Sequence, residues 1–230
     1  MLVLLEIGFL LLSYLIGSIP FGLLIVRLST GKDIRNVESG RTGGTNAMRA
    51  AGFWAGLGTA ILDLLKAAAV VWLARILFPG DIWMEVLSPI AAVVGHNYSV
   101  FIIEKNEKGQ LHLRGGAGGA STVGGALGLW APSILFILPI GAIILFVIGY
   151  ASVATMSVAF VATLIFVYRA ITGASPWQFV LYGLFTEALL VIGLLPNINR
   201  LMHGKERVVG LRARKTNASK YTSRDGSDFQ

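Results

Sequence analysis

Residues 2–26 read LVLLEIGFLLLSYLIGSIPFGLLIV, an apolar run with one charged residue, Glu6. A helix of about 20 apolar residues can cross the hydrocarbon core of a bilayer, which is about 30 Å thick. No Lys or Arg precedes the run, and it lacks the short apolar region and small-residue cleavage site of a secretory signal peptide. We therefore expect this segment to be retained as a membrane-spanning helix.

Six further apolar runs predict that most of the chain lies in a membrane. They mix Val, Ile and Leu with Gly, Ala and Ser, without the apolar–polar alternation over about ten residues that barrel strands need. The predicted fold class is all-α, a polytopic helical membrane protein of about seven transmembrane helices. A five-span arrangement stays open, because the fourth run is short and the fifth and sixth meet without a polar loop. The seven runs are 2–26, 53–79, 82–103, 115–131, 133–150, 152–171 and 177–196.

The composition excludes several classes of protein. The chain has 230 residues, of which 55% are hydrophobic and 13% charged, and its mean hydropathy of +0.72 lies outside the range of ordinary soluble domains. It has no cysteine, which excludes disulfides, a thiolate nucleophile and a zinc–cysteine site. The net charge of +7 would suit nucleic acid, but basic residues in a membrane protein chiefly record topology. No nucleic-acid partner is predicted.

The cations predict the orientation of the chain. Of its 19 Lys and Arg residues, 16 lie in residues 27–52, residues 104–114 and the segment from Asn197 onward. A chain that starts outside and crosses seven times places these three segments in the cytoplasm, in line with the cytoplasmic excess of Lys and Arg. Residues 1–209 are predicted to form a single transmembrane domain. Residues 210–230 are predicted to be a basic, disordered cytoplasmic tail.

The first of these polar segments has the composition of an anion-binding loop. Between Glu38 and Arg49, glycines let backbone N–H groups approach an anion, and arginines supply charge and a planar fork of donors. The helix expected next would add the partial positive charge of its N-terminus. The alternative is a flexible connector whose arginines only set topology. The candidate ligands of an anion are Ser39, Arg41, Gly43, Gly44, Thr45, Asn46 and Arg49.

The other two polar segments have similar alternatives. The second runs from Gly95-His96 to Ser121-Thr122. Its glycines suit anion binding and also close packing of membrane helices, and the two roles are compatible. The third, Pro196 to Leu201 with Glu206 after it, taken alone is typical of an interfacial helix end.

Three of the charged residues within the apolar runs are candidates for a structural or functional role. Asp63 and Lys66 are three residues apart, so they share one face of a helix, where an ion pair lowers the cost of burying either charge. We interpret them as a structural pair. Glu187 has no such partner nearby in the sequence and is either a functional carboxylate or a cap against another helix.

Taken together, the three polar segments resemble the cytoplasmic motifs of the acyl-phosphate:glycerol-3-phosphate acyltransferase family. The resemblance covers residues 16–206 and keeps the order and spacing of the motifs. The matching residues are Gly17-Ser18-Ile19-Pro20-Phe21-Gly22, Gly31-Lys32-Asp33-Ile34-Arg35, Ser39-Gly40 to Arg49, Gly52, Leu62-Asp63-Leu64-Leu65-Lys66, Gly95-His96, Gly115-Gly116, Gly118, Tyr150, Ser152, Asn197-Ile198, Arg200-Leu201 and Glu206.

The resemblance implies a seven-helix enzyme of the cell membrane whose active site faces the cytoplasm. Such enzymes transfer a fatty acyl group from acyl phosphate to the 1-hydroxyl of glycerol 3-phosphate, giving lysophosphatidic acid for phospholipid synthesis. They use neither coenzyme A nor a metal, so no cofactor is implied, and the partners are the two phosphate substrates and membrane lipids. An acyl phosphate is already activated, so the protein must mainly orient two anions and stabilise an oxyanion.

The resemblance also assigns roles to residues. Ser39, Arg49 and Asn197 are the implied catalytic residues, with Ser39 and Arg49 holding a substrate phosphate, while Asn197 and Glu206 order the third motif. The other residues implied to bind substrate are Arg41, Gly43, Gly44, Thr45, Asn46, His96, Arg114, Gly115, Gly116, Gly118 and Glu206.

The chain departs from the family pattern at four positions. Arg41 replaces an Asn, Ala117 a Lys, Leu194 a His and Gly149 an Arg, and residues 102–113 lengthen the second loop. A catalytically altered or inactive relative is therefore one alternative. A small phosphate-ester transporter is another, although the halves of the chain show no internal repeat. Our hypothesis is that Arg41 substitutes for the cation missing at Ala117.

Overall fold

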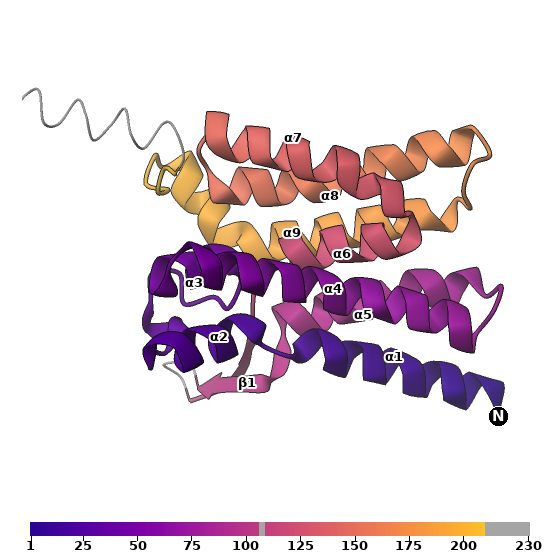
Figure 1. Ribbon diagram of the computed structural model, residues 1–230, viewed down its shortest axis with the longest axis horizontal. Coiled ribbons are helices and arrows are strands. Elements are labelled where there is room, and N and C mark those ends of the chain that lie inside the picture. Colours follow the sequence, from indigo (N-terminus) through magenta and orange to yellow (C-terminus); the bar gives the residue numbers. More distant parts are fainter. Residues whose placement is uncertain (106–108, 210–230) are drawn as a thin grey trace, which may run out of the picture.

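The computed structural model describes residues 1–105 and 109–209, and this part of the chain is mostly helical (Figure 1). One small antiparallel sheet, β1 (Ser99–Lys105) with β2 (Leu111–Arg114), and two short 3-10 helices, η1 (Ile34–Asn36) and η2 (Ala131–Ser133), complete it. The α-helices are α1 (Leu2–Ser18), α2 (Phe21–Thr30), α3 (Gly44–Ala51), α4 (Phe53–Leu77), α5 (Ile82–Asn97), α6 (Gly119–Leu129), α7 (Ile134–Val147), α8 (Ala151–Ile171) and α9 (Gln178–Met202).

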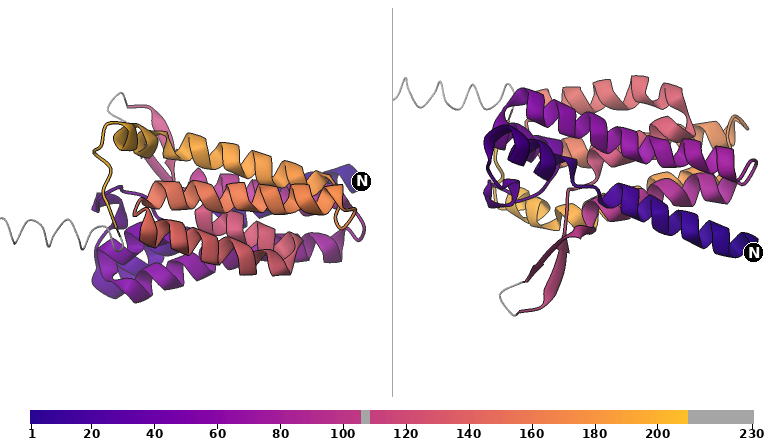
Figure 2. Two further views of the ribbon diagram at one scale, coloured as in Figure 1. Left: turned by 90° about the horizontal axis from the view of Figure 1, so that it is seen from above. Right: turned by 60° about the horizontal axis from the view of Figure 1, so that its bottom comes forward.

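The longer helices lie roughly side by side along the long axis and form a bundle (Figure 1). α1 packs against α5, α4 against α6, and α8 against α9. The short elements α2, α3 and β1 gather at one end, together with the C-terminal end of α9 (Figures 1 and 2). The polar segments that are far apart in the sequence therefore meet at this end.

Small residues let the helices approach closely. A Cβ atom on Gly17 would collide with the backbone of Ala92, and one on Gly124 with the carbonyl of Leu64. Glycine at such contacts is typical of helix packing in membranes. Close packing of this kind thus occurs at Gly124, two residues beyond the second polar segment.

The surface of the bundle is apolar. Large side chains point outward, including Leu135 (70% exposed), Phe160 (56%) and Ile171 (81%). Three segments of the described chain are long and apolar enough to cross a membrane, Leu2–Thr30, Ala151–Ile171 and Gln178–Met202, and Ala131–Val147 is a shorter apolar one. The count of seven spans and the orientation stay predictions.

The first predicted helix is interrupted. α1 ends at Ser18 and α2 begins at Phe21, because Pro20 lacks an N–H and disfavours helical geometry at the preceding residue, Ile19. The run 115–131 is helical only from Gly119, after four residues that include three glycines. By contrast, Pro196 does not interrupt α9, which continues to Met202.

The prediction of a third helix over residues 82–103 is partly wrong. The helix ends at Asn97, and the chain continues as β1, where Val and Ile favour an extended backbone. β1 pairs with β2, so the longer second loop of residues 102–113 contributes to a hairpin. The all-α prediction is therefore correct for the bundle and wrong for this hairpin.

Candidate active site

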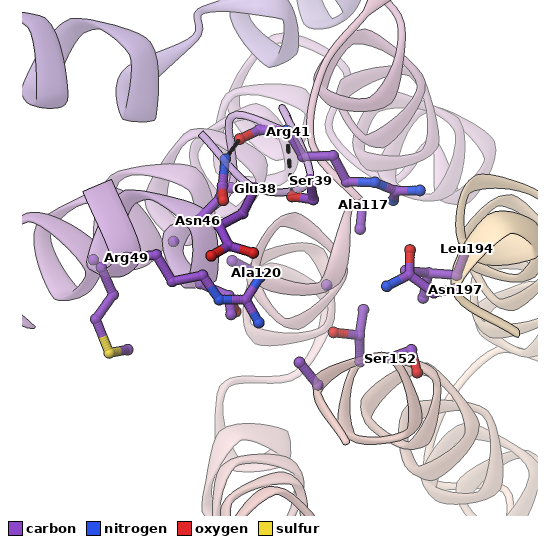
Figure 3. A pocket seen from close by; sticks show the side chains of 18 of the residues that line it. Glu38, Ser39, Arg41, Asn46, Arg49, Ala117, Ala120, Ser152, Leu194 and Asn197 are labelled. Carbon is purple, nitrogen blue, oxygen red and sulfur yellow. Dashed lines mark hydrogen bonds between the residues drawn. The ribbon is translucent and has the colours of Figure 1, made fainter. Parts of the chain in front are cut away.

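A cleft of about 540 Å³ opens at the end of the bundle where the short elements gather. Its walls come from all three predicted polar segments and from the start of α8 (Figure 3). The lining residues that the sequence singled out are Ser39, Arg41, Gly43, Gly44, Thr45, Asn46, Arg49, Asp63, His96, Gly118, Asn197 and Glu206.

The first loop is held in shape by Asn46. Its buried amide nitrogen donates to the carbonyl oxygens of Ile34 (3.2 Å), Val37 (2.9 Å) and Arg41 (2.9 Å). Gly40 has a φ of 64°, a conformation that few other residues adopt. These features turn the loop so that Ser39 and Arg41 both reach the cleft.

Two helices present their N-termini to the cleft. α3 begins after Gly43 and α6 after Gly118, and neither N-terminus has a side-chain cap. The first N–H groups of a helix lack partners within the helix and carry its positive dipole end, so they favour an anion. Because Gly43, Gly44, Gly118 and Gly119 line the cleft, a ligand can approach both backbones closely.

Two arginines supply positive charge. The Arg41 side chain extends past Ala117 toward α9 and donates a hydrogen bond to the carbonyl of Gly193, while Arg49 reaches in from α3 (Figure 3). Within residues 1–105 and 109–209, neither guanidinium forms an ion pair with a carboxylate.

Burial makes these two guanidiniums suited to anions. It lowers the pKa of Arg41, with a smaller contribution from repulsion by Arg200, and it lowers the pKa of Arg49, with repulsion from Arg207. An arginine stays protonated in proteins, so each is a partly desolvated cation, and among the described residues only the more distant Glu38 and Glu206 attract Arg49. A bound phosphate would relieve that cost.

The third segment is fixed by a strap, which we define as residues 204–209. Glu206 in the strap accepts hydrogen bonds from Ser152 Oγ (2.7 Å) and from Asn197 Nδ2 (3.2 Å). The N–H of Val209 donates to the carbonyl of Gly149 (2.7 Å), and Arg207 pairs with Glu38 of the first loop. The strap thus joins the end of α9 to the α7–α8 turn and orients Asn197.

A buried cluster of charges lies beneath the cleft. Lys66 Nζ is 2.8 Å from Asp63 Oδ1 and 3.0 Å from His96 Nδ1, and it also donates to the carbonyl of Ile19 (2.9 Å). The ammonium is thus a second donor to the carbonyl of Ile19, which also accepts from the N–H of Phe21 (3.1 Å) where the first helix is interrupted. His96 has its Nδ1 in this cluster and its ring packed against Gly116.

Comparison with known proteins decides the family. The model of the family described as glycerol-3-phosphate acyltransferase matches residues 7–204. This chain belongs to the glycerol-3-phosphate acyltransferase family. A glycerol-3-phosphate acyltransferase of Thermus thermophilus is 38% identical over 89% of this chain and 95% of its own length, and one of Rubrobacter xylanophilus is 35% identical over 91% and 98%.

Solved structures of an acyltransferase have the same fold. The crystal structure of PlsY (YgiH), an integral membrane glycerol 3-phosphate acyltransferase, in its glycerol 3-phosphate form superposes with a TM-score of 0.77 at 30% identity. The alignment covers 89% of this chain and 96% of PlsY. The lysophosphatidic acid form of PlsY gives a TM-score of 0.75 at 28% identity.

Three residues of this acyltransferase that were predicted to bind substrate do not line the cleft. Arg114 pairs with Glu104 (2.7 Å) and packs against Gly40, and Gly116 packs under His96. The carbonyl of Gly115 accepts from the N–H of Thr42 (3.3 Å). These three residues support the first loop from behind.

Further residues line the cleft that the sequence had not assigned to the site. Ser152 and Arg200 match the family motifs without an implied role, and Lys205 was missed. Ser152 reaches Glu206 from the start of α8, and Arg200 and Lys205 add positive charge near the strap. Glu187 stays a candidate without a role, since its Oε2 is buried without a hydrogen-bond partner in the described chain.

Proposed function

We propose that this acyltransferase transfers a fatty acyl group from acyl phosphate to the 1-hydroxyl of glycerol 3-phosphate, releasing phosphate and forming lysophosphatidic acid. The observation that carries the proposal is the cleft, where two uncapped helix N-termini and two guanidiniums without carboxylate partners come together. A reaction between a phosphate ester and an acyl phosphate, both of them anions, needs two anion sites in one cavity. The relatives of this chain are named glycerol-3-phosphate acyltransferases.

The chemistry asks little more of the protein than binding and orientation. The oxygen of the 1-hydroxyl attacks the acyl carbon, a new C–O bond forms, and the bond from the acyl carbon to the phosphate oxygen breaks. The phosphate leaves with the electron pair, and the hydroxyl proton passes to it or to water. Alignment of the two substrates and donors aimed at the developing oxyanion lower the barrier of such a transfer.

We assign the two ends of the cleft to the two anions. Arg49, Ser39 and the N-terminus of α3 form one end, and Arg41 with the N-terminus of α6 forms the other. Asn197, held by Glu206, lies between α8 and the loop that carries Arg41 (Figure 3). The charge distribution supports a cleft on the cytoplasmic side of the cell membrane.

A catalytically altered relative is the second candidate, because Ala117 and Leu194 leave part of the cleft without polar side chains. Arg41 favours the active enzyme, since its guanidinium occupies the space beside these two residues (Figure 3). No feature of the described chain favours a transporter over an enzyme.

The test is acyl transfer by the purified protein. We expect lysophosphatidic acid, detected by mass spectrometry, from palmitoyl phosphate and glycerol 3-phosphate, and none when palmitoyl coenzyme A replaces the acyl phosphate. A blank without protein and a working relative assayed in parallel are the controls. Product at the level of the blank, while the relative works, would refute the proposal and favour the altered enzyme.

A further inference from the structure

The hairpin of β1 and β2 exposes an apolar face and turns its charged face toward the protein, the reverse of a hairpin in water. Side chains along a strand alternate between its two faces, and directly paired residues share a face. Ile103 pairs with Leu113, and Lys105 with Leu111, so these four residues lie on one face. The face is largely apolar and exposed: Ile103 is 51% and Leu111 72% exposed. Phe101 lies in the irregular part of β1 between Ser99 and Ile103 and is 58% exposed.

The polar face of the hairpin points toward the protein. Glu104 pairs with Arg114 (2.7 Å) and Arg35 (3.4 Å), and Ile102 beside it is buried. In a hairpin on a soluble protein the apolar face would cover the core and the charged face would meet water. The opposite arrangement here requires an apolar environment on the outer side.

The position of the hairpin indicates which environment this is. Ser99 Oγ donates to the carbonyl of Ser18 (2.6 Å) and Tyr14 Oη to that of Tyr98 (2.8 Å), so the base of the hairpin is fastened to the end of α1. α1 and α2 belong to the apolar segment Leu2–Thr30, and their outer side chains include Leu15 and Leu28, which are 42% and 87% exposed.

The apolar face of the hairpin therefore continues the apolar outer surface of α1 and α2. Figure 2 shows the hairpin projecting sideways from the cleft end of the bundle. Phe53 (59% exposed) and Trp54 (79%) lie at the same end, at the start of α4, where aromatic side chains mark the boundary between lipid and water.

We propose that the hairpin is a membrane-surface anchor, whose outer face, Ile103, Leu111 and Leu113, lies in the lipid of the leaflet at the cleft end. This role is independent of the proposed acyl transfer. A two-stranded hairpin is only marginally stable in water, and lipid contact supplies the apolar cover that it lacks. The anchor also fixes the second polar segment at the membrane surface, beside the cleft.

The absence of cysteine makes the test direct. We would prepare the variants Ile103→Cys and Leu113→Cys on the outer face and His112→Cys on the opposite face. Each is labelled with a nitroxide and placed in nanodiscs of phosphatidylcholine and phosphatidylglycerol that hold one copy. Leu135→Cys on α7, where the side chain is 70% exposed, serves as a reference for lipid contact.

Power saturation measures how accessible each nitroxide is to oxygen, which reports contact with lipid, and to a water-soluble nickel complex, which reports contact with water. We expect the oxygen-to-nickel accessibility ratio at positions 103 and 113 to approach that of 135 and to exceed that of 112 severalfold. Equal ratios at 103, 113 and 112 would overturn the proposal. So would outer-face labels shielded from both reagents, or lipid-like ratios that appear only in discs with two copies, since these indicate protein contact.

Discussion

Arg75, at the end of the bundle away from the cleft, and the two cleft arginines are partnered differently. At the end away from the cleft, Arg75 binds Glu85 (2.8 Å) and donates to the carbonyls of Gly128 (2.8 Å) and Leu129 (2.9 Å). The N-terminus of α5 there is capped by Asp81, which accepts from the N–H groups of Trp83 (2.9 Å) and Met84 (3.1 Å). The Arg75 guanidinium and the N-terminus of α5 are thus satisfied within the protein, whereas the N-termini of α7 and α9 at this end have no side-chain cap.

The cleft end presents two helix N-termini and two arginines to a cavity. The N-termini of α3 and α6 have no side-chain cap, and Arg41 and Arg49 have no carboxylate among the described residues. Uncapped helix ends and unpaired cations cost stability, and a protein tolerates them where a ligand supplies the missing partner. The difference between Arg75 and the two cleft arginines thus separates a structural charge from charges available to substrate.

The largest effect is expected for Arg49→Ala. A charge-assisted contact to phosphate contributes about 1.5–3 kcal/mol, so kcat/KM should fall more than tenfold. The melting temperature should stay close to that of the parent, because no partner in the described chain is lost. Arg75→Ala is the matched control and should lower the melting temperature while folded protein stays active. An unchanged kcat/KM for Arg49→Ala would place this residue outside the site.

A smaller effect is expected for Arg41→Asn. Part of the Arg41 guanidinium is used on Gly193, so we expect a severalfold loss of kcat/KM. Adding Ala117→Lys to this variant should restore much of the activity, because a lysine there would place its charge in the same space. The two substitutions then form a non-additive cycle, measured by steady-state kinetics of all four proteins. Additive effects would contradict the hypothesis that Arg41 substitutes for the cation missing at Ala117.

The smallest effect is expected at the far end, for Asp81→Ala. Losing a helix cap costs about 1 kcal/mol, so the free energy of unfolding should fall by that amount while kcat/KM per folded molecule is unchanged. Thermal unfolding in one detergent gives the stability, and Asp81→Asn, which can still cap, should lose less. A loss of activity without a loss of stability would break the contrast between the two ends.

The sequence predicted the family and the helical bundle because both depend on local features. Apolar length locates membrane helices, since backbone groups in lipid must be satisfied within the helix. The motif order led to the acyltransferase family, which the comparisons confirm. The interruption at Ile19 and Pro20 lay inside an apolar run, so length alone concealed it.

The choice among the arginines could not be made from the sequence. Arg41 and Arg114 both lie in glycine-rich polar segments, and both were predicted to bind substrate. Arg114 forms an ion pair with Glu104, which the hairpin places beside it. By contrast, the backbone turn at Gly40 directs Arg41 into the cleft. Both outcomes depend on contacts between distant segments, which no local pattern records.

Lys66 has a consequence for how the chain is made. During synthesis the first 26 residues reach the membrane before α4 exists, so within that segment the carbonyl of Ile19 has the N–H of Phe21 (3.1 Å) as its donor. Lys66 can enter the bilayer beside Asp63, three residues earlier on the same helix, as a pair without net charge. The bond from Lys66 to Ile19 then forms only when α4 docks on the first two helices, so the interruption is fixed at that step of assembly.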